Sequence, residues 1–159
     1  MDTKSKSVQR VKKALQDYGL KEVEVVELPE STRTAVAAAE AVKCEVAQIA
    51  KSLVFTGKDS GKSVLVITSG ANRVDEEIIS QDLGEDISMA TPDFVREKTS
   101  FAIGGVPPIA HFEEPIVYID EDLLQYQEIW AAAGSPNTVF KLSPDELEKM
   151  TGGKILKVV

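Results

Sequence analysis

Apolar residues recur along the chain at two different spacings, and the change between them predicts where helices give way to strands. Val8, Val11, Leu15 and Tyr18 repeat at helical spacing, and Gly19 follows them as a stop signal. The sequence therefore predicts that the chain opens with a helix.

Two β-rich runs in the first half of the chain predict a hairpin. Residues 51–55 and 63–68 form the runs, and the polar segment TGKDSGK, which carries two glycines, joins them as a hairpin loop would. Because a hairpin requires antiparallel pairing and the elements do not alternate strictly as strand and helix, the pattern disfavours a doubly wound parallel fold. A mixed sheet flanked by helices fits better. Further strands are predicted over residues 23–28, 116–120, 138–142 and 154–159.

Capping residues mark the starts of four further helices. Each predicted cap is a Ser, Thr or Asp, whose side chain can accept from the first free backbone amides. The last helix combines Ser143 and Glu146 as a capping box, and Gly152 with Gly153 ends it. The predicted caps are Thr34 before residues 35–42, Asp75 before a helix ending near Gly84, Thr91 before Pro92, and Ser143.

Length and composition fit one ordinary domain, residues 1–159, with 43% hydrophobic residues to form its core. No stretch approaches the roughly 18 uncharged residues of a membrane span, so the expected location is the cytoplasm, without a membrane partner. Cys44 and His111 are the single cysteine and histidine, which excludes an intramolecular disulfide and an ordinary Cys/His zinc site. We expect no metal and no cofactor.

The net charge of −8 argues against non-specific binding to nucleic acid, DNA included, because such binding depends on Lys and Arg neutralising phosphates. It leaves open the recognition of one end of an RNA. Five basic residues lie within the first thirteen positions, where a solvated helix face is favoured over an RNA-contacting patch. They are Lys4, Lys6, Arg10, Lys12 and Lys13.

Lys51 places one ammonium group inside an apolar stretch, QIAKSLVF. If residues 49–55 are extended, Lys51 shares a face with Ile49, Leu53 and Phe55. On spacing alone, the favoured interpretation is that Lys51 lies at a strand end and extends its ammonium group to water, because lysines are almost never buried without a partner. The alternative is an ammonium on a pocket wall that binds a carbonyl oxygen, a carboxylate or a phosphate.

The segment FAIGGVPPIAHF, residues 101–112, carries no formal charge. Gly104 and Gly105 permit backbone angles and close approaches that a side chain would forbid, and Pro107 with Pro108 fixes the turn that follows. Such a loop can direct backbone N–H groups at an oxygen, as a site that polarises a carbonyl requires. A buried connection that only fills the core fits equally well.

Two nearby features also have a structural and a functional interpretation. His111 could donate to a ligand or orient a water, but for a lone histidine a hydrogen bond to the backbone is favoured. Gly134 and Ser135 lie in the loop AAAGSPNTVF, which is typical of a turn and could also form the floor of a small pocket.

Six stretches in this order resemble the YbaK and prolyl-tRNA synthetase-associated editing domain family, over nearly the whole chain. They are TRTAVAAAEAV, QIAKSLVF, GANRVDEEII, ISMATPDFV, FAIGGVPPIAH and IWAAAGSPNTVFKLSPDELEKMTGG. The resemblance implies a single α+β domain with a mixed, largely antiparallel, curved sheet flanked by helices. It also implies the chemistry of free-standing members, which hydrolyse mischarged aminoacyl-tRNA in trans.

Position within these motifs implies a role for individual residues. Lys51 falls on the family's functional lysine, which reverses the odds that spacing alone gave it. The implied substrate contacts are Thr34, Gly104, Gly105, Val106, Pro107, Pro108, His111, Gly134 and Ser135. Two positions depart from the family pattern, since Ala110 and Lys43 stand where relatives commonly have glycine.

The resemblance implies a substrate of tRNA(Pro) carrying a small wrong amino acid such as Ala or Cys. Its acceptor end would be the main partner, with prolyl-tRNA synthetase as a further one. We expect Lys51 to position the terminal phosphate or the ester oxygens, and amides near Gly104 and Gly105 to stabilise the oxyanion. A water or the adjacent ribose hydroxyl would attack, and pocket size would select the amino acid.

Two alternatives to this enzyme remain at this point. One is a catalytically inactive module that holds an aminoacyl nucleotide. The other is a protein-binding module that uses residues 101–112 as an exposed apolar patch.

Overall fold

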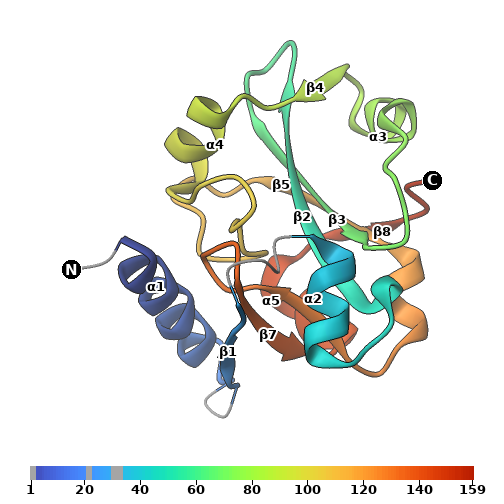
Figure 1. Ribbon diagram of the computed structural model, residues 1–159. Coiled ribbons are helices and arrows are strands. Elements are labelled where there is room, and N and C mark those ends of the chain that lie inside the picture. Colours follow the sequence, from blue (N-terminus) through green and yellow to red (C-terminus); the bar gives the residue numbers. More distant parts are fainter. Residues whose placement is uncertain (1–2, 21–22, 30–33) are drawn as a thin grey trace.

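The computed structural model describes residues 3–20, 23–29 and 34–159. The strands are β1 (Val25–Glu27), β2 (Ile49–Gly57), β3 (Ser63–Ser69), β4 (Ile87–Met89), β5 (Ile116–Asp120), β6 (Ile129–Ala132), β7 (Thr138–Leu142) and β8 (Lys154–Leu156). The helices are α1 (Thr3–Asp17), α2 (Ala35–Val42), α3 (Glu76–Leu83), α4 (Pro92–Thr99) and α5 (Pro144–Thr151), with short 3-10 helices η1 (Val46–Gln48) and η2 (Glu121–Gln125). Figure 1 shows α1 and α3 at opposite ends of the molecule.

All eight strands belong to one mixed sheet, in the order β1-β7-β6-β2-β3-β5-β8, with β4 also paired to β2. The predicted hairpin is confirmed, because β2 and β3 pair antiparallel with Lys51 opposite Thr68. Four pairings are antiparallel (β1 with β7, β2 with β3, β2 with β4, β6 with β7), and three are parallel (β2 with β6, β3 with β5, β5 with β8). The sheet is therefore mixed, as the sequence predicted, although β4 and β6 were not predicted as strands.

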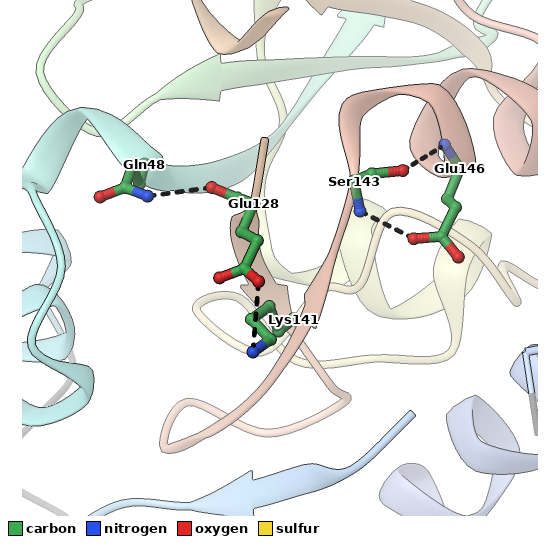
Figure 2. Close-up of polar contacts among 5 residues, drawn as sticks. All are labelled: Gln48, Glu128, Lys141, Ser143 and Glu146. Atoms are coloured by element: carbon green, nitrogen blue, oxygen red, sulfur yellow. Dashed lines mark hydrogen bonds and ion pairs between the residues drawn. The ribbon is translucent and has the colours of Figure 1, made fainter. Parts of the chain in front are cut away.

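Local capping explains why the helices begin where they do, and the four predicted N-caps are confirmed. Thr34 Oγ1 accepts from the Ala37 amide at 3.1 Å, and Asp75 and Thr91 cap α3 and α4 in the same way. The capping box of α5 is complete. Ser143 Oγ accepts from the Glu146 amide at 3.1 Å, and the Ser143 amide donates to Glu146 Oε1 at 2.8 Å (Figure 2).

Helices cover both faces of the sheet. On one face Leu15 of α1, Val95 of α4 and Leu147 of α5 join the largest buried cluster. On the other face, Ile79 of α3 packs in a second cluster and Ala39 of α2 in a third. None of the described helices is long and apolar enough to cross a membrane.

Polar contacts fix the start of β6 beside β2. The Gln48 side chain in η1 donates to the Glu128 carbonyl at 3.0 Å, one residue before β6 begins (Figure 2). Lys141 on β7 forms an ion pair with the Glu128 carboxylate at 3.5 Å. Both side chains of that pair are about half exposed, so the ion pair adds little stability. These contacts matter because the end of β6 borders the candidate site.

Candidate active site

One edge of β2 lies open between two short strands. β6 pairs with β2 only at Ile49 and Ala50, and β4 pairs with it only at residues 55–57. The opposite edge is covered by β3 throughout this stretch. Among the described strands, residues 51–53 therefore have a sheet partner on one edge alone.

A cavity of about 470 Å³ opens at this gap. Its walls include Lys51, Ser52, Gly104 of the loop before β5, Trp130 of β6 and Pro136 of the turn between β6 and β7. The volume lies in the range of pockets that bind small organic ligands. The cavity thus unites segments from the first and last thirds of the chain.

The lining is apolar and built largely from small side chains. Among the described residues that line the cavity, Lys51 has the only charged side chain. Alanines make up much of the remaining wall: Ala35, Ala38, Ala50, Ala90, Ala131 and Ala132. A ligand in this cavity would meet one positive charge on an otherwise neutral surface.

Lys51 follows the strand alternation that the sequence predicted. Ile49 and Phe55 pack in the clusters beneath α2 and α3, whereas Ala50 and Val54 pack in the cluster on the opposite face. Lys51 therefore belongs to the α2 and α3 face, and it lies between two apolar clusters.

The ammonium group of Lys51 is partly buried and has a specific partner. Nζ donates to the main-chain carbonyl of Asn72 at 2.9 Å. Burial lowers the pKa of Lys51 below its ordinary value, and the negative charge of Asp120 acts in the opposite direction. This side chain is not the freely solvated strand-end lysine that spacing alone favoured.

Within the glycine-rich loop, Gly104 and Val106 line the cavity but Gly105 does not. Gly104 adopts a φ of +91°, which a residue with a side chain rarely does. The Gly105 amide donates to the Ala102 carbonyl at 3.1 Å, so it is already used within the loop. Of the amides expected near Gly104 and Gly105, that of Gly104 is therefore the candidate donor, and its role in stabilising an oxyanion stays a prediction.

Gly105 has a packing role instead. A Cβ at this position would lie 2.7 Å from the Cα of Ser135, which is closer than real side chains approach. The two loops that sequence analysis singled out thus meet backbone to backbone. This contact places Gly104 near Pro136, both on the cavity wall.

Pro107, Pro108 and His111 do not line the cavity. His111 Nε2 bonds to the Pro107 carbonyl at 2.7 Å, which fastens the loop to itself. Burial lowers the pKa of His111, and the nearby Arg10 charge lowers it further, against the hydrogen bond to Pro107. A neutral structural histidine follows, which agrees with the interpretation favoured from the sequence.

Gly134 and Ser135 form the turn rather than the pocket floor. Gly134 adopts a φ of +106° and packs against the Ser7 carbonyl of α1. Ser135 is buried, and its Oγ lies 2.7 Å from Thr138 Oγ1. Of this loop, Pro136 reaches the cavity, a residue that sequence analysis did not select.

Thr34 both caps α2 and lines the cavity, so its predicted place in the site fits the geometry. Ser52, next to Lys51, was missed. The residue lines the cavity, and its Oγ is buried without a hydrogen-bond partner among the described residues. Because buried hydroxyls are normally paired, Ser52 Oγ is available to a ligand or water.

The two departures from the family pattern share one backbone feature. Lys43 has a φ of 60° at the C-cap of α2, and Ala110 has a φ of 69° after the proline pair. Glycine adopts this left-handed conformation without the strain that a Cβ causes. The structure thus explains why glycine suits both positions.

Segment 101–112 is not the continuous exposed patch that a protein-binding module would use. Phe101, Val106 and Ile109 are buried, although Ile103 and Phe112 are exposed.

Cys44 is partly buried. Burial raises the pKa of its thiol, and the negative charge of Glu45 raises it further. In the part of the chain that the structure describes, no three His, Cys, Asp or Glu residues are grouped to hold a metal ion.

Solved structures support the same architecture. A crystal structure described as "a putative trans-editing enzyme for prolyl tRNA synthetase" is 48% identical, with a TM-score of 0.91 and 96% of each chain covered. A scaffold used for epitope backbone grafting by computational design is 44% identical, with a TM-score of 0.92 and 97% of each chain covered.

Sequence comparison gives relatives of similar length. Uncharacterized protein YwhH of Bacillus subtilis is 33% identical over 135 residues, 85% of each chain. The Enterococcus faecalis protein named "Putative Cys-tRNA(Pro)/Cys-tRNA(Cys) deacylase EbsC" is 26% identical over 121 residues, 76% of this chain and 73% of its own. The family model for the aminoacyl-tRNA editing domain matches residues 29–150. The chain therefore belongs to the aminoacyl-tRNA editing domain family.

Proposed function

We propose that this protein acts as one editing domain that hydrolyses the ester bond of mischarged aminoacyl-tRNA in trans. One observation carries the proposal. The cavity at the open edge of β2 is apolar and holds a single charged side chain, Lys51, among its described lining residues. Such a site suits a neutral amino-acid side chain next to a phosphate or a developing oxyanion.

The reaction needs little covalent chemistry from the protein, because an aminoacyl ester is already reactive. A water attacks the carbonyl carbon, and the bond to the ribose oxygen then breaks. Attack by the ribose hydroxyl beside the ester would move the acyl group to that hydroxyl, and a water must then still hydrolyse the new ester. With water as the attacking group, a proton passes to the leaving ribose oxygen, and the products are the free amino acid and uncharged tRNA. No His, Asp or Glu is found among the described residues of the cavity wall. The protein would therefore act by orientation and electrostatics.

Lys51 is assigned to the phosphate of the terminal adenosine or to the ester oxygens. Its ammonium has three N–H groups, of which one is used by the Asn72 carbonyl. The amide of Gly104 is the second candidate donor to the oxyanion, because Gly104 lines the cavity and the Gly105 amide is occupied. Ser52 Oγ could bind the attacking water or a substrate oxygen.

The amino acid removed is proposed to be small and uncharged, such as Ala or Cys. The alanine-rich wall offers no partner for a charged side chain, and burying an unpaired charge would be costly. The names of two similar proteins, which mention prolyl tRNA synthetase and Cys-tRNA(Pro), support tRNA(Pro) as the carrier. Prolyl-tRNA synthetase is then a candidate partner, and the cytoplasm is the location where both would meet this protein.

A panel of charged tRNAs tests the proposal. Purified protein is incubated with alanyl-, cysteinyl- and seryl-tRNA(Pro), with correctly charged prolyl-tRNA(Pro) as the matched control, and the remaining ester is measured over time. We expect fast loss of at least one small mischarged species and slow loss of the control. Retention of every ester, with tRNA or aminoacyl-adenosine bound, would favour an inactive binding module instead.

A further inference from the structure

Asn72 connects Lys51 to two carboxylates without allowing an ion pair to form. Its main-chain carbonyl accepts a hydrogen bond from the Lys51 ammonium at 2.9 Å. Its side-chain Nδ2 donates to Asp120 Oδ2 at 2.9 Å and to Asp122 Oδ2 at 2.7 Å. One residue therefore binds the cation through its backbone and both anions through its carboxamide.

The Asp120 carboxylate is fully buried and fixed by several donors. Oδ2 accepts from the Ser69 amide at 3.0 Å as well as from Asn72, and Oδ1 accepts from the Asp122 amide at 3.0 Å. These bonds join the ends of β3 and β5 to the start of η2. Since buried charges persist only when they are hydrogen-bonded, this arrangement keeps the carboxylate in one place.

Asn72 is itself held from both sides. Its amide donates to the Ser69 carbonyl at 2.9 Å, and the Ser69 hydroxyl donates to the Ala47 carbonyl at 2.7 Å. The turn after β3 is thus tied to the segment just before β2. Because Lys51 lies on β2, the carbonyl of Asn72 has a fixed position relative to the cavity.

Lys51 therefore carries a positive charge near the buried Asp120 carboxylate, but its hydrogen-bond partner is a neutral carbonyl. An ammonium that paired directly with Asp120 or Asp122 would have part of its charge cancelled and would be drawn from the cavity wall. Asn72 occupies those carboxylates instead. Among the described residues, the carbonyl of Asn72 is the one hydrogen-bond acceptor of Nζ, so two N–H groups are available to a ligand.

We propose that Asn72, supported by Asp120 and Asp122, is a positioning residue that keeps the Lys51 ammonium on the cavity wall and free of an ion pair. This inference deepens the proposed function, because its consequence for hydrolysis depends on Lys51 binding substrate oxygen. The positioning itself does not depend on hydrolysis. The two parts can therefore be tested by separate measurements.

The first measurement is the titration of Lys51 by NMR of its Cε and Nζ groups, assigned with a Lys51→Arg variant. Asn72→Ala frees the carboxylates to pair with the ammonium, and an opposite charge at close range raises a lysine pKa by about 1 unit. Asp122→Asn should lower the Lys51 pKa, since it removes a negative charge while its side-chain oxygen can still accept from Asn72.

A matched control comes from the same segment. Glu121→Gln removes one negative charge, as Asp122→Asn does, at the sequence position between Asp120 and Asp122. The Glu121 side chain, however, is exposed. This substitution should leave the Lys51 titration almost unchanged. Arg73, the charged neighbour of Asn72 in the turn, is also exposed and is kept in all variants. An Asn72→Ala protein that folds with an unaltered Lys51 pKa, or a Glu121→Gln effect as large as that of Asp122→Asn, would overturn the proposal.

The second measurement is kcat/KM for the mischarged tRNA that the wild type hydrolyses. Asn72→Ala should reduce it by about 10- to 100-fold, the loss typical of a misplaced charged hydrogen-bond donor. Adding Asp122→Asn to that variant should restore part of the activity, because the competing carboxylate is removed. A purely structural role predicts further loss in the double variant. If the wild type hydrolyses no tRNA, the proposed function fails, and the titration still decides the positioning.

Discussion

Removal of the Lys51 charge is the most direct perturbation of the site. Lys51→Met keeps an unbranched side chain of similar length, so the cavity wall stays filled. Two unit charges 4 Å apart interact with about 4 kcal/mol at an effective dielectric constant of about 20, which corresponds to about 10³-fold in rate. A net charge-assisted hydrogen bond of about 1.5 to 3 kcal/mol sets the lower end, about 10-fold. No other charged side chain among the described lining residues could compensate.

The assay is single-turnover deacylation of the mischarged tRNA, with kcat and KM then measured separately. A fall in kcat assigns Lys51 to the developing oxyanion, whereas a rise in KM assigns it to the terminal phosphate. Lys58→Met is the matched control, because Lys58 is an exposed lysine beyond the end of β2 and outside the cavity lining. The same loss of charge there should leave both constants unchanged. Lys51→Met activity within threefold of the wild type, in a folded protein, would refute the reasoning.

Three further predictions concern stability. Lys43→Gly should stabilise the protein by about 1 kcal/mol in urea unfolding, because Lys43 is exposed and has a left-handed φ of 60°. Lys13→Gly, within α1, is the control and should destabilise the protein by about 1 kcal/mol. Changes of the same sign in the free energy of unfolding of both variants would contradict this reasoning. Gly105→Ala should cost about 1 to 3 kcal/mol and reduce activity, because the new Cβ would lie 2.7 Å from the Cα of Ser135, and wild-type thermal unfolding would argue against that contact. The lowered pKa of Lys51 means that the unfolded chain binds its proton more readily, so stability should rise with pH from the lowered pKa up to about 10.5. Lys51→Met should remove that part of the rise, and an identical pH dependence in both proteins would show that burial does not disfavour the charge.

Much of the fold was predictable because its signals are local. Thr34 and Ser143 cap helices through atoms three residues away, and Gly84 ends α3 in the left-handed conformation. The hairpin of β2 and β3 follows from two adjacent runs and their loop. Such contacts depend on neighbouring residues, which the chain presents in order.

The parts that sequence analysis missed depend on pairing between distant segments. β4 has three residues and β6 has four, and each pairs with β2 from far along the chain. Neither is long enough to show a clear alternation. Pro136 and Ser52 were overlooked as pocket residues for the same reason, since a turn residue and a strand residue reveal their common cavity only after folding.

The sequence by itself determined the mixed sheet, the N-caps of four helices, and the presence of a lysine in an apolar strand, together with an uncharged glycine and proline loop. Tertiary structure alone decided what that lysine does. Lys51 lines a cavity because β6 and β4 stop short of each other along β2, and its ammonium donates a hydrogen bond to the carbonyl of Asn72, 21 residues later, in place of a carboxylate. Hydrogen-bond partners of a buried charge are chosen by three-dimensional proximity, and spacing along the chain carries no record of that choice.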